Sequence, residues 1–177
     1  MLNVLEIKNY MVLVNSSEKI IEDMPSLDQF NHVINFIEDE SGGKFWDATS
    51  KSASSSIRVP IGLGDSKALV LDPKNIHFET LGSYHQHVSK IAIDRVISIK
   101  AEKLLVNEKI VMTDYYASFI RLYLQSQDQN AQRKWGESMI GNVYSNSKVV
   151  AFVIDGLFDN DKDLSVSINY EIPERIF

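Results

Sequence analysis

The chain has 177 residues, of which 44% are hydrophobic and 24% are charged, and its net charge at pH 7 is −6. This composition predicts a folded globular protein with a hydrophobic core and argues against extended disorder. The negative charge argues against a sequence-independent nucleic-acid-binding protein, which needs basic groups to neutralise phosphates.

Three absences in the sequence narrow the class of protein further. The chain has no cysteine, which excludes disulfides, thiolate zinc sites and cysteine nucleophiles. No stretch approaches the roughly 20 apolar residues of a membrane-spanning helix. The first residues also lack the basic and apolar regions of a signal peptide. We therefore expect a cytoplasmic protein.

The first part of the chain is predicted to form a strand, a short return strand and a helix. Residues 4–14 form the strand, and residues 19–22 return after a turn at 15–17. Ser26 is a favourable N-cap, Gln29 completes a capping box with it, and Gly42 follows the last helical residues. Between them, apolar residues recur at helical spacing: Leu27, Phe30, Val33, Ile34 and Ile37.

A serine-rich segment follows, which begins at Asp47 and ends at Ser56. Its small polar residues predict a mobile loop. The loop could link two domains, but the residues before it are few for an independent core. We therefore predict a single domain over residues 1–177.

The middle of the chain is predicted to be rich in strands. Short strands are expected at 57–60, at 67–71 and from residue 76, with a turn at 72–75. Residues 90–100 are expected to form a long strand, because its isoleucines share one parity and only Arg95 interrupts them. Residues 109–112 add a further short strand.

Two helices are predicted after these strands. Residues 114–127 are predicted to be helical with Asp114 as the cap, because their apolar residues have helical spacing, although their aromatic content also fits a strand. These residues are Tyr116, Phe119, Ile120, Tyr123 and Leu124. A second helix is expected at 128–140, with Gly141 at its end.

The stretch from Lys148 to Ile172 is predicted to be a β-hairpin. Its first arm, residues 149–154, is apolar throughout, which is typical of a central strand covered on both faces. Its second arm alternates, with one apolar face formed by Leu164, Val166, Ile168, Tyr170 and Ile172. Because strands cluster along the chain, we predict an α+β fold with a largely antiparallel β-sheet flanked by two or three helices.

The turn of this hairpin carries Asp159, Asp161 and Asp163. Their spacing matches the first three ligand positions of a calcium loop. However, Leu164 stands where the sharp turn needs glycine, and Tyr170 stands where a bidentate glutamate should complete the coordination. We therefore interpret the turn as an exposed acidic tip that could bind a basic partner.

Three histidines give an alternative hypothesis, a metal-dependent enzyme. On a strand, His85 and His87 would point to the same face, and His77 lies nearby in the sequence. Three imidazoles can hold a divalent metal and leave a position open for water. No zinc-enzyme motif such as His-Glu-x-x-His accompanies them.

A second alternative is a nucleic-acid-binding module. The aromatic residues at 115, 116, 119 and 123 could stack against bases. Arg121, Arg133 and Lys134 could contact phosphates. Aromatic residues at helical spacing are more often part of a core, and the overall charge is unfavourable.

The sequence contains no recognisable catalytic constellation or cofactor motif. We therefore expect a protein that binds another protein and is not an enzyme. In size, acidity and absence of catalytic motifs, the chain is similar to bacterial immunity proteins, which neutralise toxins delivered between competing bacteria. This resemblance implies stoichiometric inhibition of a basic, nuclease-like toxin, with Asp159, Asp161 and Asp163 among the residues that cover its active site.

Overall fold

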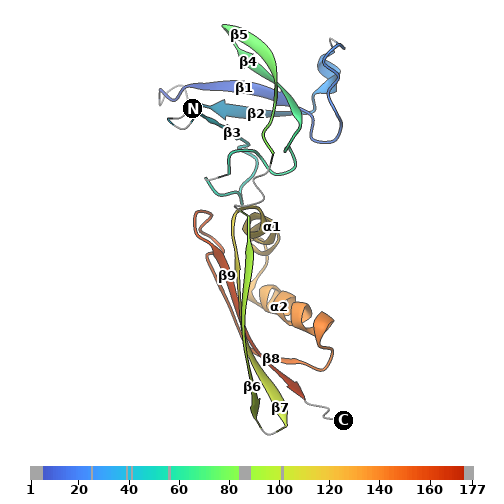
Figure 1. The fold of residues 1–177 in the computed structure, drawn as a ribbon, viewed down its shortest axis with the longest axis vertical. Helices are drawn as coiled ribbons and strands as arrows, with labels where there is room; N and C mark the ends of the chain where they lie inside the picture. Colours follow the sequence, from blue (N-terminus) through green and yellow to red (C-terminus); the bar gives the residue numbers. More distant parts are fainter. Residues whose placement is uncertain are drawn as a thin grey trace. The chain divides into compact units, whose positions relative to one another are not determined.

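The computed structural model describes residues 6–24, 26–38, 40, 42–55, 57–83, 89–100 and 102–173. The chain divides into two compact units, each with its own β-sheet (Figure 1). Unit 1 comprises Met1–Lys51 and Ser55–His85, and unit 2 comprises Ser52–Ser54 and Gln86–Phe177. None of the helices in the described residues has the length and apolar content needed to cross a lipid bilayer.

Unit 1 is a five-stranded antiparallel sheet with the strand order β3-β2-β1-β4-β5. Its strands are β1 (Asn9–Val14), β2 (His32–Ile37), β3 (Lys44–Trp46), β4 (Lys67–Asp72) and β5 (Asn75–Thr80). Alternate residues of the central strands, including Val12, Val14, Ile34 and Val70, form a buried core. The predicted turn at 72–75 is confirmed, because Asp72 pairs with Asn75 across the β4–β5 turn.

The predicted helix at 26–42 is wrong. Ser26 does cap a helical turn, since its hydroxyl accepts the Asp28 amide, but that turn is a 3₁₀ helix of three residues, Leu27–Gln29. Residues His32–Ile37 form β2 instead and pair with β1 over six residues. The β-branched Val33, Ile34 and Ile37 fit a strand well, and pairing with β1 overrides the helical spacing.

Unit 2 is a four-stranded antiparallel sheet with the order β6-β7-β9-β8 and two helices. Its elements are β6 (Ile91–Lys100), β7 (Lys103–Met112), α1 (Asp114–Leu124), α2 (Gln129–Val143), β8 (Lys148–Asp155) and β9 (Leu164–Pro173). Both helices lie on the same side of the sheet (Figure 1). The predicted C-terminal hairpin is confirmed as β8 and β9.

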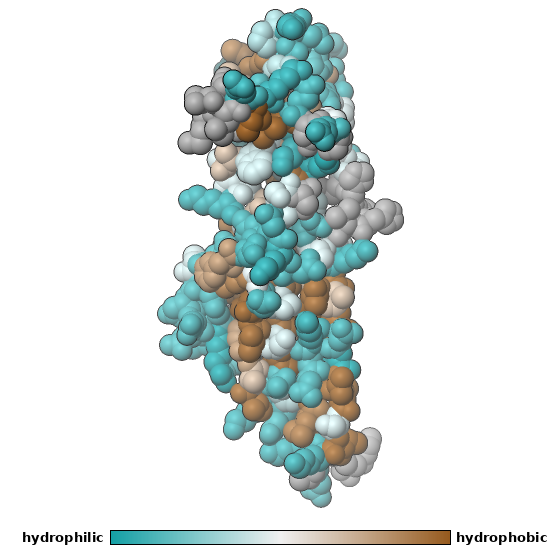
Figure 2. All heavy atoms as spheres, turned by 90° about the vertical axis from the view of Figure 1, so that its left-hand side faces the viewer, coloured by the Kyte–Doolittle hydropathy of each residue, from teal (hydrophilic) through white to brown (hydrophobic). Residues whose placement is uncertain are grey.

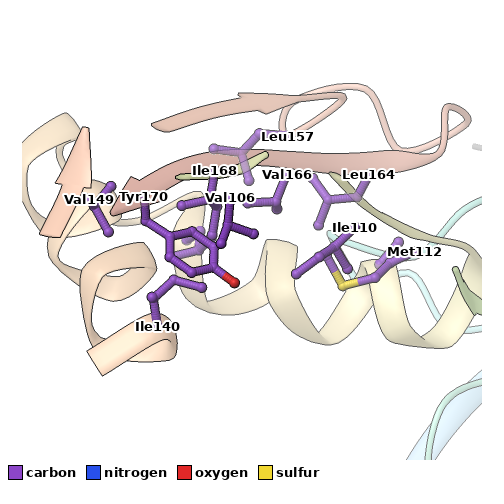
Figure 3. Close-up of a cluster of buried hydrophobic side chains, with 12 residues drawn as sticks. Val106, Ile110, Met112, Ile140, Val149, Leu157, Leu164, Val166, Ile168 and Tyr170 are labelled. Carbon is purple, nitrogen blue, oxygen red and sulfur yellow. The ribbon is translucent and has the colours of Figure 1, made fainter. Parts of the chain in front are cut away.

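The core of unit 2 lies between this sheet and the helices. Figure 3 shows its side chains, which come mainly from alternate positions of β7 and β9. The second arm of the hairpin behaves as predicted, because Leu164, Val166 and Ile168 are fully buried. Gly136 in the middle of α2 allows a close approach to β8, since a Cβ there would clash with the ring of Phe152.

The first arm of the hairpin is not a central strand. β8 is an edge strand, and Val150 and Val153 are exposed. α2 packs against one face of β8 and leaves the other face open. The apolar run at 149–154 therefore did not mean that both faces of the strand are buried, because such a run does not show where the strand lies in the sheet.

Several element boundaries also differ from the sequence predictions. The backbone N-cap of α1 is Thr113, not Asp114, and α2 continues past Gly141 to Val143. No strand is found at 19–22 or among the described residues of 57–60, and the strand predicted at 109–112 starts at Lys103. The α+β class and the antiparallel pairing are confirmed, with the strands divided between two sheets.

Candidate functional site

The candidate site is the β8–β9 loop, Gly156–Asp163, at the end of the C-terminal hairpin. It carries the three aspartates that the sequence identified. Asp159, Asp161 and Asp163 are all exposed. Asp155 precedes the loop as the last residue of β8 and is also exposed. The loop therefore presents a group of carboxylates to solvent.

A buried arginine holds the backbone of this loop in place. Arg121 of α1 is 0% exposed. Its Nη2 donates to the carbonyl oxygens of Gly156 (2.9 Å), Asp159 (2.9 Å) and Lys162 (2.6 Å). Nε donates to Gly156 at 3.0 Å, and Nη1 lies 3.4 Å from the carbonyl of Asn160. A single side chain thus satisfies carbonyl groups along the whole loop.

Electrostatics link the same arginine to the aspartates. Burial lowers the pKa of Arg121 below its usual value, because it disfavours the charged form. The charges of Asp159, Asp163 and Asp161 act in the opposite direction and raise that pKa. The guanidinium remains protonated at neutral pH. The loop carboxylates therefore help to compensate a buried cation while they stay exposed to solvent.

Two further features fix the shape of the loop. Gln125, one turn after Arg121, donates from Nε2 to the Leu157 carbonyl at 2.8 Å. Gly156 has a φ of 75°, and a Cβ there would clash with the carbonyl oxygen of Asp163. Glycine is required because the chain reverses tightly against itself at this point. Leu157 is buried and anchors the base of the loop in the core.

Phe158 is the exposed apolar residue of the loop. Its side chain is 75% exposed, directly between buried Leu157 and acidic Asp159. A large aromatic ring held in water on a tethered backbone loses little backbone entropy when a partner covers it. The loop thus presents one exposed aromatic side chain among exposed carboxylates.

The helix that holds the loop also exposes aromatic side chains. Tyr116, Phe119 and Tyr123 of α1 are exposed, whereas Ala117, Ser118, Arg121 and Leu124 form its buried face. Most of the apolar residues whose spacing predicted this helix therefore lie on its exposed side. Arg121 lies on the buried face, because from there its side-chain nitrogens donate hydrogen bonds to the carbonyl oxygens of the β8–β9 loop.

The structure brings together the three predicted aspartates, but the sequence did not identify Arg121 or Phe158 as part of the site. Sequence spacing placed Arg121 among candidate phosphate contacts, and its burial excludes that role. A signal for Phe158 was present, because a large aromatic residue in a turn rich in Asp and Asn is unusual.

The histidine cluster is only partly described by the structure. His77 lies on β5, where its Nδ1 is 2.9 Å from the carbonyl of Asn75 and its Nε2 is 3.7 Å from a carboxylate oxygen of Glu79. His85 and His87 lie outside the described residues. The described residues contain no group of three or more side chains that could hold a metal ion. The metal hypothesis therefore stays a prediction.

The start of the serine-rich segment is tied to β2. The Nε2 of His32 lies 3.0 Å from a carboxylate oxygen of Asp47, and the other oxygen accepts both the amide and the hydroxyl of Thr49. Burial raises the pKa of Asp47, but the hydrogen bonds from Thr49 and His32 outweigh it and hold that pKa below its usual value. The mobility of the segment stays a prediction.

Unit 1 also has an open apolar groove of about 320 Å³. Leu27, Phe30, Leu69 and Phe78 are among its lining residues. The Gln29 side chain at the groove is engaged with the backbone of Ile21 and Met24. The groove therefore offers apolar contact, and its lining residues do not assemble a catalytic group.

Comparison of this chain with protein-family models, curated proteins and solved structures gives no match. Function therefore has to be inferred from the arrangement of the chain's own residues.

Proposed function

We propose that this protein is a stoichiometric inhibitor that binds another protein through the β8–β9 loop, in the manner of a bacterial immunity protein. The observation that carries the proposal is the 75% exposure of Phe158 on a loop whose backbone is fixed by buried Arg121. A structural aromatic residue would be buried, and a merely flexible loop would not require a buried guanidinium.

The partner that fits this loop has an apolar pocket inside a basic surface. Phe158 enters the pocket as the anchor, because truncation of a central aromatic residue costs about 2 kcal/mol or more in many interfaces. Asp159, Asp161 and Asp163 face the surrounding basic groups. A nuclease active site has this character, since it binds a polyanionic substrate.

The rigidity of the loop favours tight binding. Association costs free energy for each segment that must be ordered, and a pre-organised loop avoids most of that cost. The carboxylates contribute in a different way. They accelerate the encounter with a basic partner, so the association rate falls as salt rises.

The test requires a candidate toxin, to be sought as a basic domain encoded beside the gene for this chain, and uses that domain in purified form. The wild-type protein should abolish its activity at an equimolar ratio. Phe158→Ala should raise Kd by about 30-fold or more, which corresponds to about 2 kcal/mol. The increase should appear mainly in the dissociation rate.

A charge reversal separates the role of the aspartates from that of Phe158. Asp161→Lys should lower the association rate and flatten its salt dependence. Asp23→Lys is the matched control, because Asp23 is exposed in unit 1 and the charge change is the same. Unchanged binding by both Phe158→Ala and Asp161→Lys would exclude this loop as the inhibitory surface.

A further inference from the structure

Strand β6 is an edge strand of the sheet in unit 2. It pairs with β7 on one side, and no strand among the described residues pairs with its other side. All ten of its residues are exposed. Five of them are nevertheless large aliphatic residues: Ile91, Ile93, Val96, Ile97 and Ile99. Figure 2 shows hydrophobic atoms, in brown, at the surface of this unit. A long and apolar edge is a ready template for another strand.

The opposite edge of the same sheet, β8, is protected in two ways that β6 is not. A register shift between Val149 and Ala151 marks a β-bulge, and α2 packs against β8 through Trp135 and Phe152. β6 pairs with β7 over all ten residues without such a shift. Bulges and covering helices are common protections of an edge. Among the described residues these protections are found on β8 and not on β6, which leaves the edge of β6 available to another strand.

Charges inside an edge strand normally deter pairing, but the two in the middle of β6, Asp94 and Arg95, each have an opposite charge on β7. The Nε of Arg95 donates to Glu108 of β7 at 2.7 Å, so the guanidinium is drawn toward its own sheet. Asp94 lies on the other face and is directly opposite Lys109 of β7. Neither charge is left without an opposite charge nearby.

We propose that β6 of two copies of this chain pair in antiparallel fashion, with Val96 on the two-fold axis, and join two four-stranded sheets into one of eight strands. Such a contact is isologous, because the same surface is used on both copies. Residues that are directly opposed in an antiparallel pair point to the same face.

The other registers are disfavoured by charge or by length. With Arg95 on the axis, the two arginines would oppose each other, and Lys100 would face Lys90. With Asp94 on the axis, two carboxylates would be opposed. Like charges in these positions are destabilising. With Ile97 on the axis, only residues 94–100 of the strand would be paired.

With Val96 on the axis, residues 92–100 are paired and no like charges are directly opposed. The opposed pairs are Ile93 with Ile99, Asp94 with Ser98, Arg95 with Ile97, and Ala92 with Lys100. Asp94 is also diagonal to Lys100 of the second copy, at about 7–8 Å, which long side chains can bridge.

The proposed register also joins the apolar faces of the two sheets. Ile93 and Ile97 are directly opposite Ile110 and Val106 of β7, which are buried. The isoleucines of β6 therefore lie on the same face as the core. Antiparallel pairing brings the isoleucine rows of the two copies side by side on that face and removes part of their surface from water.

The first test measures mass by light scattering across a dilution series. The wild-type chain should reach twice its 20.1 kDa at high concentration. Val96→Lys opposes two lysines on the axis and should weaken association by at least tenfold. Val153→Lys is the matched control, because Val153 is exposed on the same face of the other edge strand. A wild-type monomer at every concentration would overturn the proposal, and so would equal dissociation by both variants.

The second test uses the absence of cysteine to determine the register. In Val96→Cys, two opposed residues have Cβ atoms about 4.5–5.5 Å apart, near disulfide range, so mild oxidation should yield a covalent dimer. In Ser98→Cys, the two thiols lie four residues apart along the strand, about 13 Å, and should not cross-link. Cross-linking of Ser98→Cys but not of Val96→Cys would overturn this register. β6 and the β8–β9 loop are different surfaces. A monomeric protein would therefore contradict the dimer without contradicting the proposed inhibition, and a lack of inhibition would leave the dimer unaffected.

Discussion

The guanidinium of Arg121 donates twice to one carbonyl oxygen, that of Gly156, from Nε at 3.0 Å and from Nη2 at 2.9 Å. This contact joins the last turn of α1 to the first residue of the β8–β9 loop. Nη2 also donates to the carbonyl oxygens of Asp159 and Lys162 further along the loop. The position of Phe158 and of the loop aspartates therefore depends on a residue outside the loop.

Removal of the Arg121 guanidinium should lower the free energy of unfolding of unit 2. Arg121→Met keeps an aliphatic stem but leaves several partly buried carbonyl groups without their donor, and we expect a loss of about 3 kcal/mol in the free energy of unfolding. Arg121→Lys should reduce the free energy of unfolding by less than Arg121→Met, because lysine keeps the positive charge. It should still be less stable than wild type, because it lacks the several N–H donors of the guanidinium. Urea denaturation provides the measurement.

Arg133→Met serves as its control, because Arg133 is half-exposed and pairs with Glu137 on the same helix at 2.9 Å. Exposed pairs contribute about 0–1 kcal/mol. An equal cost for both arginine variants would contradict the role assigned to Arg121.

Gly156 should tolerate alanine less well than another glycine of similar backbone conformation. Gly62 has a φ of 90° with open space around it. Gly62→Ala should therefore cost only the free energy of placing an L-residue in the left-handed conformation, about 1–2 kcal/mol. Gly156→Ala adds a clash with the Asp163 carbonyl and should cost clearly more. Urea midpoints of the two variants compare the effects, and equal losses would rule out the clash.

These examples show why the sequence predicted some features and missed others. The alternation of β9 and the isoleucine parity of β6 are local properties, so the strands could be predicted. β2 could not, because its pairing with β1 is a long-range contact that overrides the helical spacing of its apolar residues. Arg121 was missed for a similar reason, since its acceptors lie more than thirty residues further along the chain.

The stability of unit 2 should depend on pH through one buried carboxylate. Glu108 is buried and accepts hydrogen bonds from Arg95 Nε (2.7 Å) and from the Tyr170 hydroxyl (2.8 Å). Burial raises the pKa of Glu108, but these two hydrogen bonds outweigh it and leave that pKa below the ordinary value of 4.5. Burial and the hydrogen bond to Glu108 raise the pKa of the Tyr170 hydroxyl, which therefore stays protonated as the donor.

Because the folded-state pKa of Glu108 is depressed, its contribution is fully present above pH 4.5 and is lost as the pH falls through the folded-state value. Glu108→Gln should therefore lower stability at neutral pH, and the difference from wild type should shrink under acidic conditions. Urea denaturation from neutral pH to well below 4.5 measures this. Glu22→Gln, at an exposed ion pair with Lys67, should show little difference at any pH. A constant deficit of Glu108→Gln would exclude the linkage.

The two tryptophans allow a direct test of whether the chain unfolds as the single domain that its sequence predicts. Trp46 lies on β3 of unit 1, and Trp135 lies on α2 of unit 2. Trp135→Phe leaves a fluorescence reporter for unit 1, and Trp46→Phe leaves one for unit 2. Because each unit has its own buried core, we expect the two reporters to show separate urea transitions.

Core truncations sharpen this prediction. Ile34→Ala in unit 1 and Ile168→Ala in unit 2 each remove a fully buried side chain and should cost about 2–5 kcal/mol. Each should shift only the transition reported by the tryptophan of its own unit. If either truncation shifts both reporters equally, the two sheets unfold together, and the chain is one cooperative domain as its sequence predicts.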